Sequence, residues 1–191
     1  MTNIQIPSGL VDENIELFSV NGQMMATHSG AVKKLFELPE SFIKKLTDEM
    51  HEFPSVVKAL EIAGFTSLKA QLEKYAECKF GGFDLAADFK DGQFSEAEYH
   101  ECGYRGSCPM EGIVCGFFKV NGRIITPFEI QIIKHLATED TLPVIAEKLQ
   151  VSMNNFESKK QILFKKMSVF SRAKLVARGY DLQILNLKLC S

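Results

Sequence analysis

Residues 125–137, ITPFEIQIIKHLA, combine a helix start with a helical repeat. Thr126 suits the N-cap, Pro127 suits the first helical position, and Glu129 follows the cap by three residues, which makes a capping box. Apolar residues then recur at helical spacing and are expected to face a core: Ile130, Ile133, Leu136 and Ala137. The stretch therefore predicts the opening helix of a C-terminal helical domain.

Three further helices are predicted downstream of this one. A short helix begins after Thr141, a tight turn at residues 151–152 leads into a longer helix beginning near Met153, and Ser171 caps the last. Four apolar residues are expected on the core side of the longer helix: Phe156, Ile162, Leu163 and Met167. Two short helices, a short turn and a longer basic helix make the helix-turn-helix arrangement.

Across this region the chain resembles a LuxR-type (GerE-type) DNA-binding domain. The opening stretch is followed by IAEKLQVS at residues 145–152 and NNFESKKQILFKKMSVFSRAKLV at residues 154–176, in the family's register and without a gap. Several matched positions are polar and are not dictated by helical periodicity; the matches are Thr126, Glu129, Ala137, Ile145, Ala146, Leu149, Ser152, Lys166, Val169 and Arg172. The resemblance implies a four-helix domain that binds DNA.

The resemblance and the residue chemistry together predict the side chains that meet DNA. Asparagine and glutamine can each make two hydrogen bonds to adenine, so base contacts are expected near the start of the longer helix: Asn154, Asn155, Ser158, Lys159 and Gln161. Backbone contacts are expected from one hydroxyl and four cations: Thr126, Lys160, Lys165, Lys166 and Arg172. The expected partner is double-stranded DNA, and a homodimer is compatible with this prediction.

The chain departs from the family pattern at several positions, and two of these departures, Val144 and Glu157, favour a second interpretation. Phe128 stands where the family has arginine, Val144 where it has glutamate, and Glu157 where a basic residue is usual. A carboxylate facing DNA costs affinity, because phosphate contacts dominate non-specific binding. The alternative is a protein-interaction module, in which the same helices bind RNA polymerase or another regulator.

Charge is distributed unevenly along the chain. From Lys119 to the end there are 12 Lys and Arg against 6 Asp and Glu, a net charge of +6. The first 118 residues carry 10 against 18, a net charge of −8. A basic C-terminal part suits a partner that carries phosphate. The alternative is that the charged residues lie on solvated surfaces and are unevenly distributed by chance.

The N-terminal part predicts a small acidic α+β module over residues 1–77. Residues 15–36 contain two turn signals, Asn21-Gly22 and Ser29-Gly30, between strand-like runs, which predicts a β-hairpin or a three-stranded meander. Three helices are then expected, over residues 38–53, from Pro54 to Gly64, and from Ser67 to Cys78. The expected fold class is mainly α with this small N-terminal β element.

Residues 78–122 lack helical or strand periodicity, contain eight glycines and carry four of the five cysteines. So long an irregular segment is rare in a compact domain unless something besides a core organises it. We expect the four thiolates to share one metal, with zinc favoured over an iron–sulfur cluster; the ligands are Cys78, Cys102, Cys108 and Cys115. A thiol–disulfide switch and plain buried cysteines are the alternatives.

The neighbours of these cysteines suggest further roles. The pattern E-x-x-x-C-x-x-R-G-x-C-x-x-E-G-x-x-C, following C-x-F-G-G-F-D, resembles a group of bacterial regulator-like proteins and implies that the four cysteines act together. Arg105 and Glu111 are expected to brace the loop, His100 is an alternative ligand, and Cys190 is expected to be free.

Other function classes find no support in the sequence. There is no glycine-rich phosphate loop, no G-x-S-x-G and no H-E-x-x-H motif, and the four histidines are scattered, so we expect no enzyme. The sequence shows neither a long apolar run nor a secretory signal, so a cytoplasmic protein without a membrane partner is expected. The leading prediction is a DNA-binding transcriptional regulator in which a metal-stabilised segment, residues 78–122, joins residues 1–77 to a helix-turn-helix domain at residues 123–191.

Overall fold

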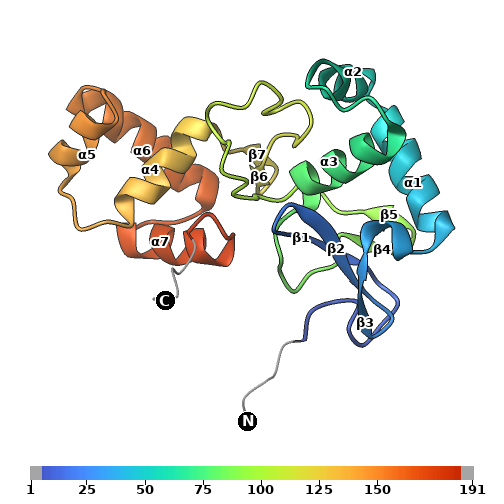
Figure 1. The fold of residues 1–191 in the computed structure, drawn as a ribbon. Helices are drawn as coiled ribbons and strands as arrows, with labels where there is room; N and C mark the ends of the chain where they lie inside the picture. The colour runs from blue at the N-terminus through green and yellow to red at the C-terminus, as the bar shows by residue number, and fades with distance from the viewer. Residues whose placement is uncertain (1–5, 186–191) are drawn as a thin grey trace, which may run out of the picture. The chain divides into compact units, whose positions relative to one another are not determined.

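The computed structural model describes residues 6–185 and divides into two compact units, Met1–Gly116 and Phe117–Ser191. Figure 1 follows the chain through both units. The fold is mixed and rich in helix, as predicted, with a few short strands. The cysteine-containing residues 78–116 fall within the first unit, and residues 117–122 within the second. Within residues 6–185, no helix has the length and hydrophobicity needed to span a membrane.

The first unit opens with a three-stranded antiparallel meander, as predicted for residues 15–36. Strands β1 (Glu16–Val20), β2 (Gln23–His28) and β3 (Ala31–Lys34) pair in chain order. Asn21 and Gly22 both have positive φ, 52° and 77°, so the first turn has the left-handed backbone that matches strand twist. The Asn-Gly pair therefore sets the register of β1 against β2, in which Val20 faces Gln23.

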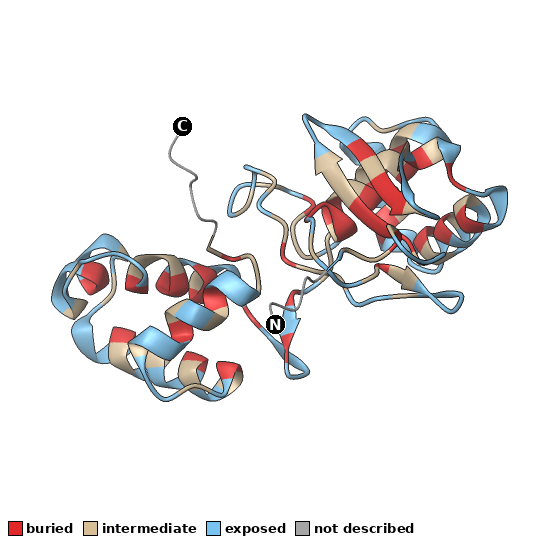
Figure 2. Cartoon of the chain, turned by 90° about the horizontal axis from the view of Figure 1, so that it is seen from below, coloured by how far each residue is buried: buried red, intermediate tan, exposed pale blue. Residues whose placement is uncertain are grey.

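Three helices follow this sheet, preceded by the short 3-10 helix η1 (Leu35–Glu37). They are α1 (Glu40–His51), α2 (Pro54–Ile62) and α3 (Leu68–Phe80). Ser67 caps α3 by accepting the N–H of Ala70 at 3.2 Å, as the sequence indicated, and α3 continues two residues beyond Cys78. Figure 2 shows the buried residues lining the inner sides of the helices and the sheet. Helix α3 lies against β1 and β2, and α1 and α2 pack against α3 and against each other, so the buried sides of the sheet and helices form one core.

The loop after α3 contains two short strands, β4 (Phe89–Lys90) and β5 (Gln93–Phe94). Phe89 forms an antiparallel bridge with Ile15 and, together with Phe94, packs on the ring of Phe42. Further along, Met110 and Val114 are buried in the same core as the sheet and helices. The loop is therefore anchored by scattered apolar side chains that no period in the sequence reveals.

The second unit contains the four predicted helices. A hairpin of β6 (Lys119–Val120) and β7 (Arg123–Ile124) precedes α4 (Pro127–Leu136), α5 (Leu142–Lys148), α6 (Met153–Met167) and α7 (Arg172–Asp181). The capping box at Thr126 is confirmed: its hydroxyl oxygen accepts the N–H of Glu129 at 3.3 Å, and the Glu129 carboxylate accepts its N–H at 2.9 Å. The core consists of buried apolar residues from all four helices: Ile132, Ile133, Ile145, Phe156, Leu163 and Leu175.

Two core predictions in this unit are wrong. Ile162 is 52 % exposed, because it lies on the side of α6 away from Phe156 and Leu163. Ala137 is exposed because it is the C-cap of α4 and no longer follows the helical stripe, while Ile132 supplies the buried contact instead.

Candidate functional site

Helix α6 has two clearly different sides. Phe156, Leu163 and Met167, which follow one another at spacings of seven and four residues, are buried against the other helices. Ser152 caps the helix by accepting the N–H of Asn155 at 3.3 Å. The exposed polar residues share the opposite side, because their spacings are those of one helix face. We call this face the α6 polar stripe: Asn154, Asn155, Ser158, Gln161 and Lys165.

Four of the five base-contacting residues predicted from the sequence, together with Lys165, make up this stripe. The fifth, Lys159, is partly buried, and its ammonium lies 5.0 Å from the centre of the Phe128 ring. Phe128 is one of the departures from the family pattern, and here it supports a cation. Lys160 forms an ion pair with Glu157 at 2.8 Å. The lysine of α6 on the stripe is therefore Lys165, whose side chain is exposed.

The other residues expected to contact the DNA backbone have internal partners. Lys166 donates to the Ile124 carbonyl at 2.9 Å and pairs with Glu129 at 2.8 Å. Thr126 uses its hydroxyl in the capping box. These side chains hold the start of α4 against α6.

Arg172 has a similar structural role at the other end of α4. Its guanidinium donates to the carbonyl oxygens of Leu136, Thr138 and Asp140, at 2.7, 2.6 and 3.1 Å. These carbonyls end α4 and lead into α5, where helical hydrogen bonding leaves acceptors without partners. Arg172, a polar residue that matches the family pattern, thus stabilises the connection between α4 and α5.

A second feature of this unit was not found from the sequence. Phe170, in the connection between α6 and α7, is 98 % exposed and borders a shallow groove that includes Phe164, Val169 and Gln161. Ile162 adds a further exposed apolar side chain to α6. Because Phe170 lies outside any helical period, only its exposure in the structure distinguishes it from a core residue.

The four cysteines of the first unit come together. Cys78 lies in the last turn of α3, and the other three belong to the loop that follows, yet all four line one small cavity. The cavity has a volume of about 20 Å³, and its other lining residues are Arg105, Met110 and Glu111. His100, the alternative ligand named from the sequence, is not among these lining residues. Cys190 lies outside the described residues.

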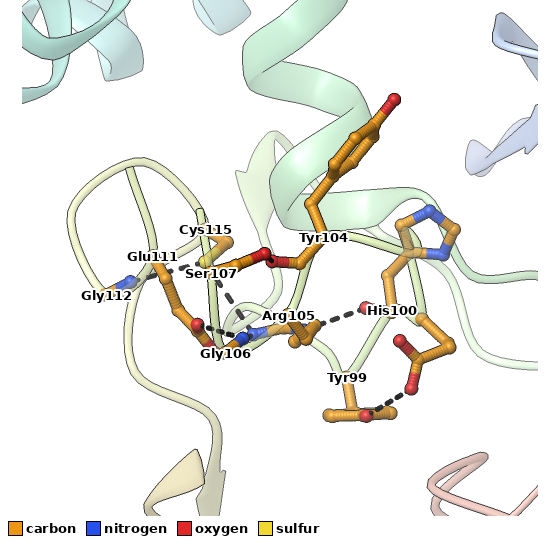
Figure 3. A network of polar contacts seen from close by, with 10 residues as sticks. Tyr99, His100, Tyr104, Arg105, Gly106, Ser107, Glu111, Gly112 and Cys115 are labelled. Atoms are coloured by element: carbon orange, nitrogen blue, oxygen red, sulfur yellow. Dashed lines mark hydrogen bonds and ion pairs between the residues drawn. The ribbon is translucent and has the colours of Figure 1, made fainter. Parts of the chain in front are cut away.

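Arg105 is the centre of the polar contacts in this loop (Figure 3). Its Nε donates to the His100 carbonyl at 2.9 Å, and its Nη1 lies 3.8 Å from the Glu111 carboxylate. The guanidinium also lies over the Tyr99 ring, 4.8 Å from its centre. Glu111 in turn accepts the N–H of Gly106 at 2.6 Å. The prediction that Arg105 and Glu111 brace the loop is therefore confirmed.

One sulfur already receives hydrogen bonds from its surroundings. The Sγ atom of Cys115 accepts the backbone N–H of Gly112 at 3.4 Å and Nη1 of Arg105 at 3.7 Å (Figure 3). The four cysteines are free thiols, and burial raises the pKa of the Cys78 thiol to about 12. Within residues 6–185, no three Cys, His, Asp or Glu side chains are close enough to hold a metal ion as they stand.

A group of buried carboxyls was also missed in the sequence. Asp88 accepts the N–H of Leu17 at 2.8 Å, and Glu16 accepts that of Asp84 at 2.8 Å, so both tie β1 to the loop. Burial raises the pKa of Glu16 and of Asp88 well above the ordinary range of carboxyls, and the proximity of the two groups raises that of Asp88 further. Both carboxyls act as structural hydrogen-bonding groups.

Comparison of the chain with protein-family models, with curated proteins and with solved structures found no match. Two features remain as candidate sites: the α6 polar stripe in the second unit and the four-cysteine cavity in the first.

Proposed function

We propose that residues 117–191 bind double-stranded DNA as the helix-turn-helix unit of a transcriptional regulator, with α6 in the major groove. The observation that carries this proposal is the α6 polar stripe, a row of amide, hydroxyl and ammonium groups opposite the buried side of a 15-residue helix. A major groove about 12 Å wide admits one α-helix, and its base edges offer hydrogen-bonding partners to amides.

Charge and helix order support the same function. The residues from 119 onward have a net charge of +6, which favours association with phosphate. α5 and α6 are joined by four residues, 149–152, in keeping with the short turn of a helix-turn-helix. Asn154 and Asn155 stand in the first turn of α6, where recognition helices present their base-reading side chains.

The internal contacts refine the assignment of roles. We assign base contacts to Asn154, Asn155 and Gln161, and a phosphate contact to Lys165. The Ser158 hydroxyl donates to the Asn154 carbonyl at 2.9 Å, so we assign it a base contact in which its oxygen accepts. Lys160 can contact a phosphate only if its ion pair with Glu157 breaks, and Lys159 can contact DNA only if its ammonium leaves the Phe128 ring. The remaining residues with internal partners act through the fold: Thr126, Lys166 and Arg172.

Binding of the full chain to a fluorescent random-sequence duplex, measured by anisotropy across a salt series, tests the proposal. The logarithm of affinity should fall linearly with that of salt concentration, and Lys165→Ala should weaken binding and reduce the slope by about one. Lys58→Ala, which removes an exposed lysine from α2 in the first unit, is the matched control and should bind as wild type does. Binding without salt dependence, or equal effects of the two variants, would overturn the proposal.

A second function, docking to a protein, is favoured by one observation. The fully exposed ring of Phe170 and the neighbouring Phe164 and Val169 form an apolar patch, and buried aromatic residues often carry interface energy. The partner on this hypothesis is RNA polymerase, another regulator or a second copy of the chain. To test this, we would compare the wild-type chain with Phe170→Ala in two measurements. One is binding to purified bacterial RNA polymerase, and the other is sedimentation of the chain alone, which reports self-association. Loss of either association in the variant, with DNA affinity unchanged, would support docking.

A further inference from the structure

We propose that Cys78, Cys102, Cys108 and Cys115 bind one thiophilic metal centre, a zinc ion or an iron–sulfur cluster, and that Arg105 is its positioning residue. The proposal concerns the first unit and does not depend on DNA binding by the second.

The main support for this proposal is that the four cysteine side chains line the same cavity. They come from the end of α3 and from three positions of an irregular loop, and the largest gap between neighbours in sequence is 23 residues. All four nevertheless line a single cavity whose other lining residues are few. Four thiolates around one small space are the ligand set of structural zinc sites and of iron–sulfur clusters.

The charges around the cavity fit such a centre. Four thiolates with a divalent zinc ion, or with a doubly charged cluster, leave a net charge of −2. Arg105 supplies one cation, with its Nη1 atom 3.7 Å from the sulfur of Cys115. Lys74 stands one helical turn before Cys78 on the same face of α3, where it pairs with Glu77 at 2.8 Å. Because Arg105 and Lys74 each also face a carboxylate, Glu111 and Glu77, they offset only part of the negative charge of four thiolates.

Arg105 is held by contacts that do not involve the cysteines. The Tyr99 ring, the His100 carbonyl and the Glu111 carboxylate orient its guanidinium from three directions. Hydrogen bonds to ligand sulfurs tune metal affinity and reduction potential. A neutral disulfide would have no use for a cation fixed in this way, which favours the metal centre over the thiol–disulfide alternative.

Metal binding must draw the side chains closer than they stand in the structure. Cys102, Cys108 and Cys115 lie in the irregular loop and not in a helix or strand, so this movement needs no change in regular secondary structure. A cluster separates its ligand sulfurs more widely than a single ion does, so zinc requires the larger movement of the two.

Metal analysis and absorption spectra of the full chain test the ligand set. The chain would be purified without oxygen and then loaded separately with zinc or with iron and sulfide. We expect one zinc ion, or a brown chromophore with about four iron atoms, per chain. Serine variants at Cys102, Cys108 and Cys115 should each lose the metal, whereas Cys190→Ser, the matched control, should retain it. If neither loading gives a stoichiometric complex, or if the control loses metal equally, the shared centre is refuted.

Two measurements remain decisive even if a serine variant fails to fold. In the wild-type chain, titration with a mercurial thiol reagent should release the metal as the four ligand thiols react, in addition to the fifth thiol, Cys190. Complete release after only one or two ligand thiols have reacted would refute a four-thiolate site. Arg105→Gln should lower metal affinity by about tenfold or more, while Arg105→Lys, which keeps the positive charge, should retain most of it. Equal affinity in all three proteins would refute the role of Arg105.

Discussion

The ammonium of Lys166 lies 2.8 Å from the carboxylate of Glu129, and this ion pair joins the capping box at the start of α4 to the last turn of α6. The side chain of Glu129 is only 8 % exposed and also accepts the N–H and the hydroxyl of Thr126. Two residues far apart in the sequence therefore satisfy one buried acceptor. Lys166 is in this way a determinant of the fold.

Lys166→Ala should destabilise the protein by on the order of 1 to 3 kcal/mol, because it leaves the Glu129 carboxylate buried without its cation. The free energy of unfolding of the full chain in urea would measure this. Lys165→Ala, the adjacent exposed lysine, is the matched control and should change stability by less than about 0.5 kcal/mol. Equal stabilities of the two variants would show that the pair contributes nothing.

Arg172→Ala should lower stability by on the order of 1.5 to 3 kcal/mol, since three carbonyl oxygens lose a charged donor. Arg172→Lys should recover only part of this loss, because an ammonium cannot match the planar fork of donors. The midpoints of urea denaturation of the three proteins would be compared. Weaker DNA binding by Arg172→Ala with wild-type stability would instead indicate a direct phosphate contact.

Glu157→Gln should tighten binding to random-sequence duplex DNA and steepen its salt dependence. The substitution removes a carboxylate from α6 and frees the Lys160 ammonium, 2.8 Å away, for phosphate. Anisotropy titrations at several salt concentrations would give both quantities. Asp181→Asn, which removes an exposed carboxylate from α7, is the matched control; an equal gain from it would mean that only net charge matters.

The stability of the first unit should fall as pH rises from about 5 to 9. Burial raises the pKa of Glu16 and of Glu98 to about 8, from an ordinary value of 4.5, so the folded chain keeps protons that the unfolded chain releases. This stability is fully present below pH 4.5 and is lost as pH rises through about 8. The free energy of unfolding should fall by up to about 1.4 kcal/mol per pH unit for each proton that only the folded state retains.

Urea denaturation at several pH values would measure that slope. Asp88→Asn should flatten it, because burial raises the pKa of Asp88 far above its ordinary value and an amide has no proton to lose. Glu40→Gln, at an exposed carboxylate in the first turn of α1, should leave the slope unchanged. Stability that rises over the same pH range would contradict the assignment of protonated buried carboxyls.

Local chemistry in the sequence was enough to predict the three-stranded meander and the helices, but not the four short strands β4 to β7. The Asn21-Gly22 pair predicted the turn between β1 and β2, the capping box at Thr126 predicted the start of α4, and apolar spacing predicted the helices of both units. These signals are readable because they depend on residues within a few positions of one another. The involvement of Arg105 and Glu111 in bracing the loop was also predictable, from their positions among the cysteines.

The order of residues 81–116 could not be read in the same way. Met110 and Val114 are buried because they pack against a sheet and helices formed much earlier in the chain, and their spacing follows no period. The burial of Glu16 and Asp88 likewise depends on the loop covering β1. Such environments are created by tertiary packing.

The sequence by itself determined the helices, the turns, the uneven charge and the number of cysteines, since each follows from residue type and local spacing. Only the tertiary structure decided which polar side chains are available to a partner. Lys165 and Lys166 are neighbours of the same type, yet one is exposed on the α6 polar stripe and the other pairs with Glu129. Likewise, it is the folding of the loop onto α3 that makes one cavity of four distant cysteines, because contacts between remote segments depend on the path of the whole chain.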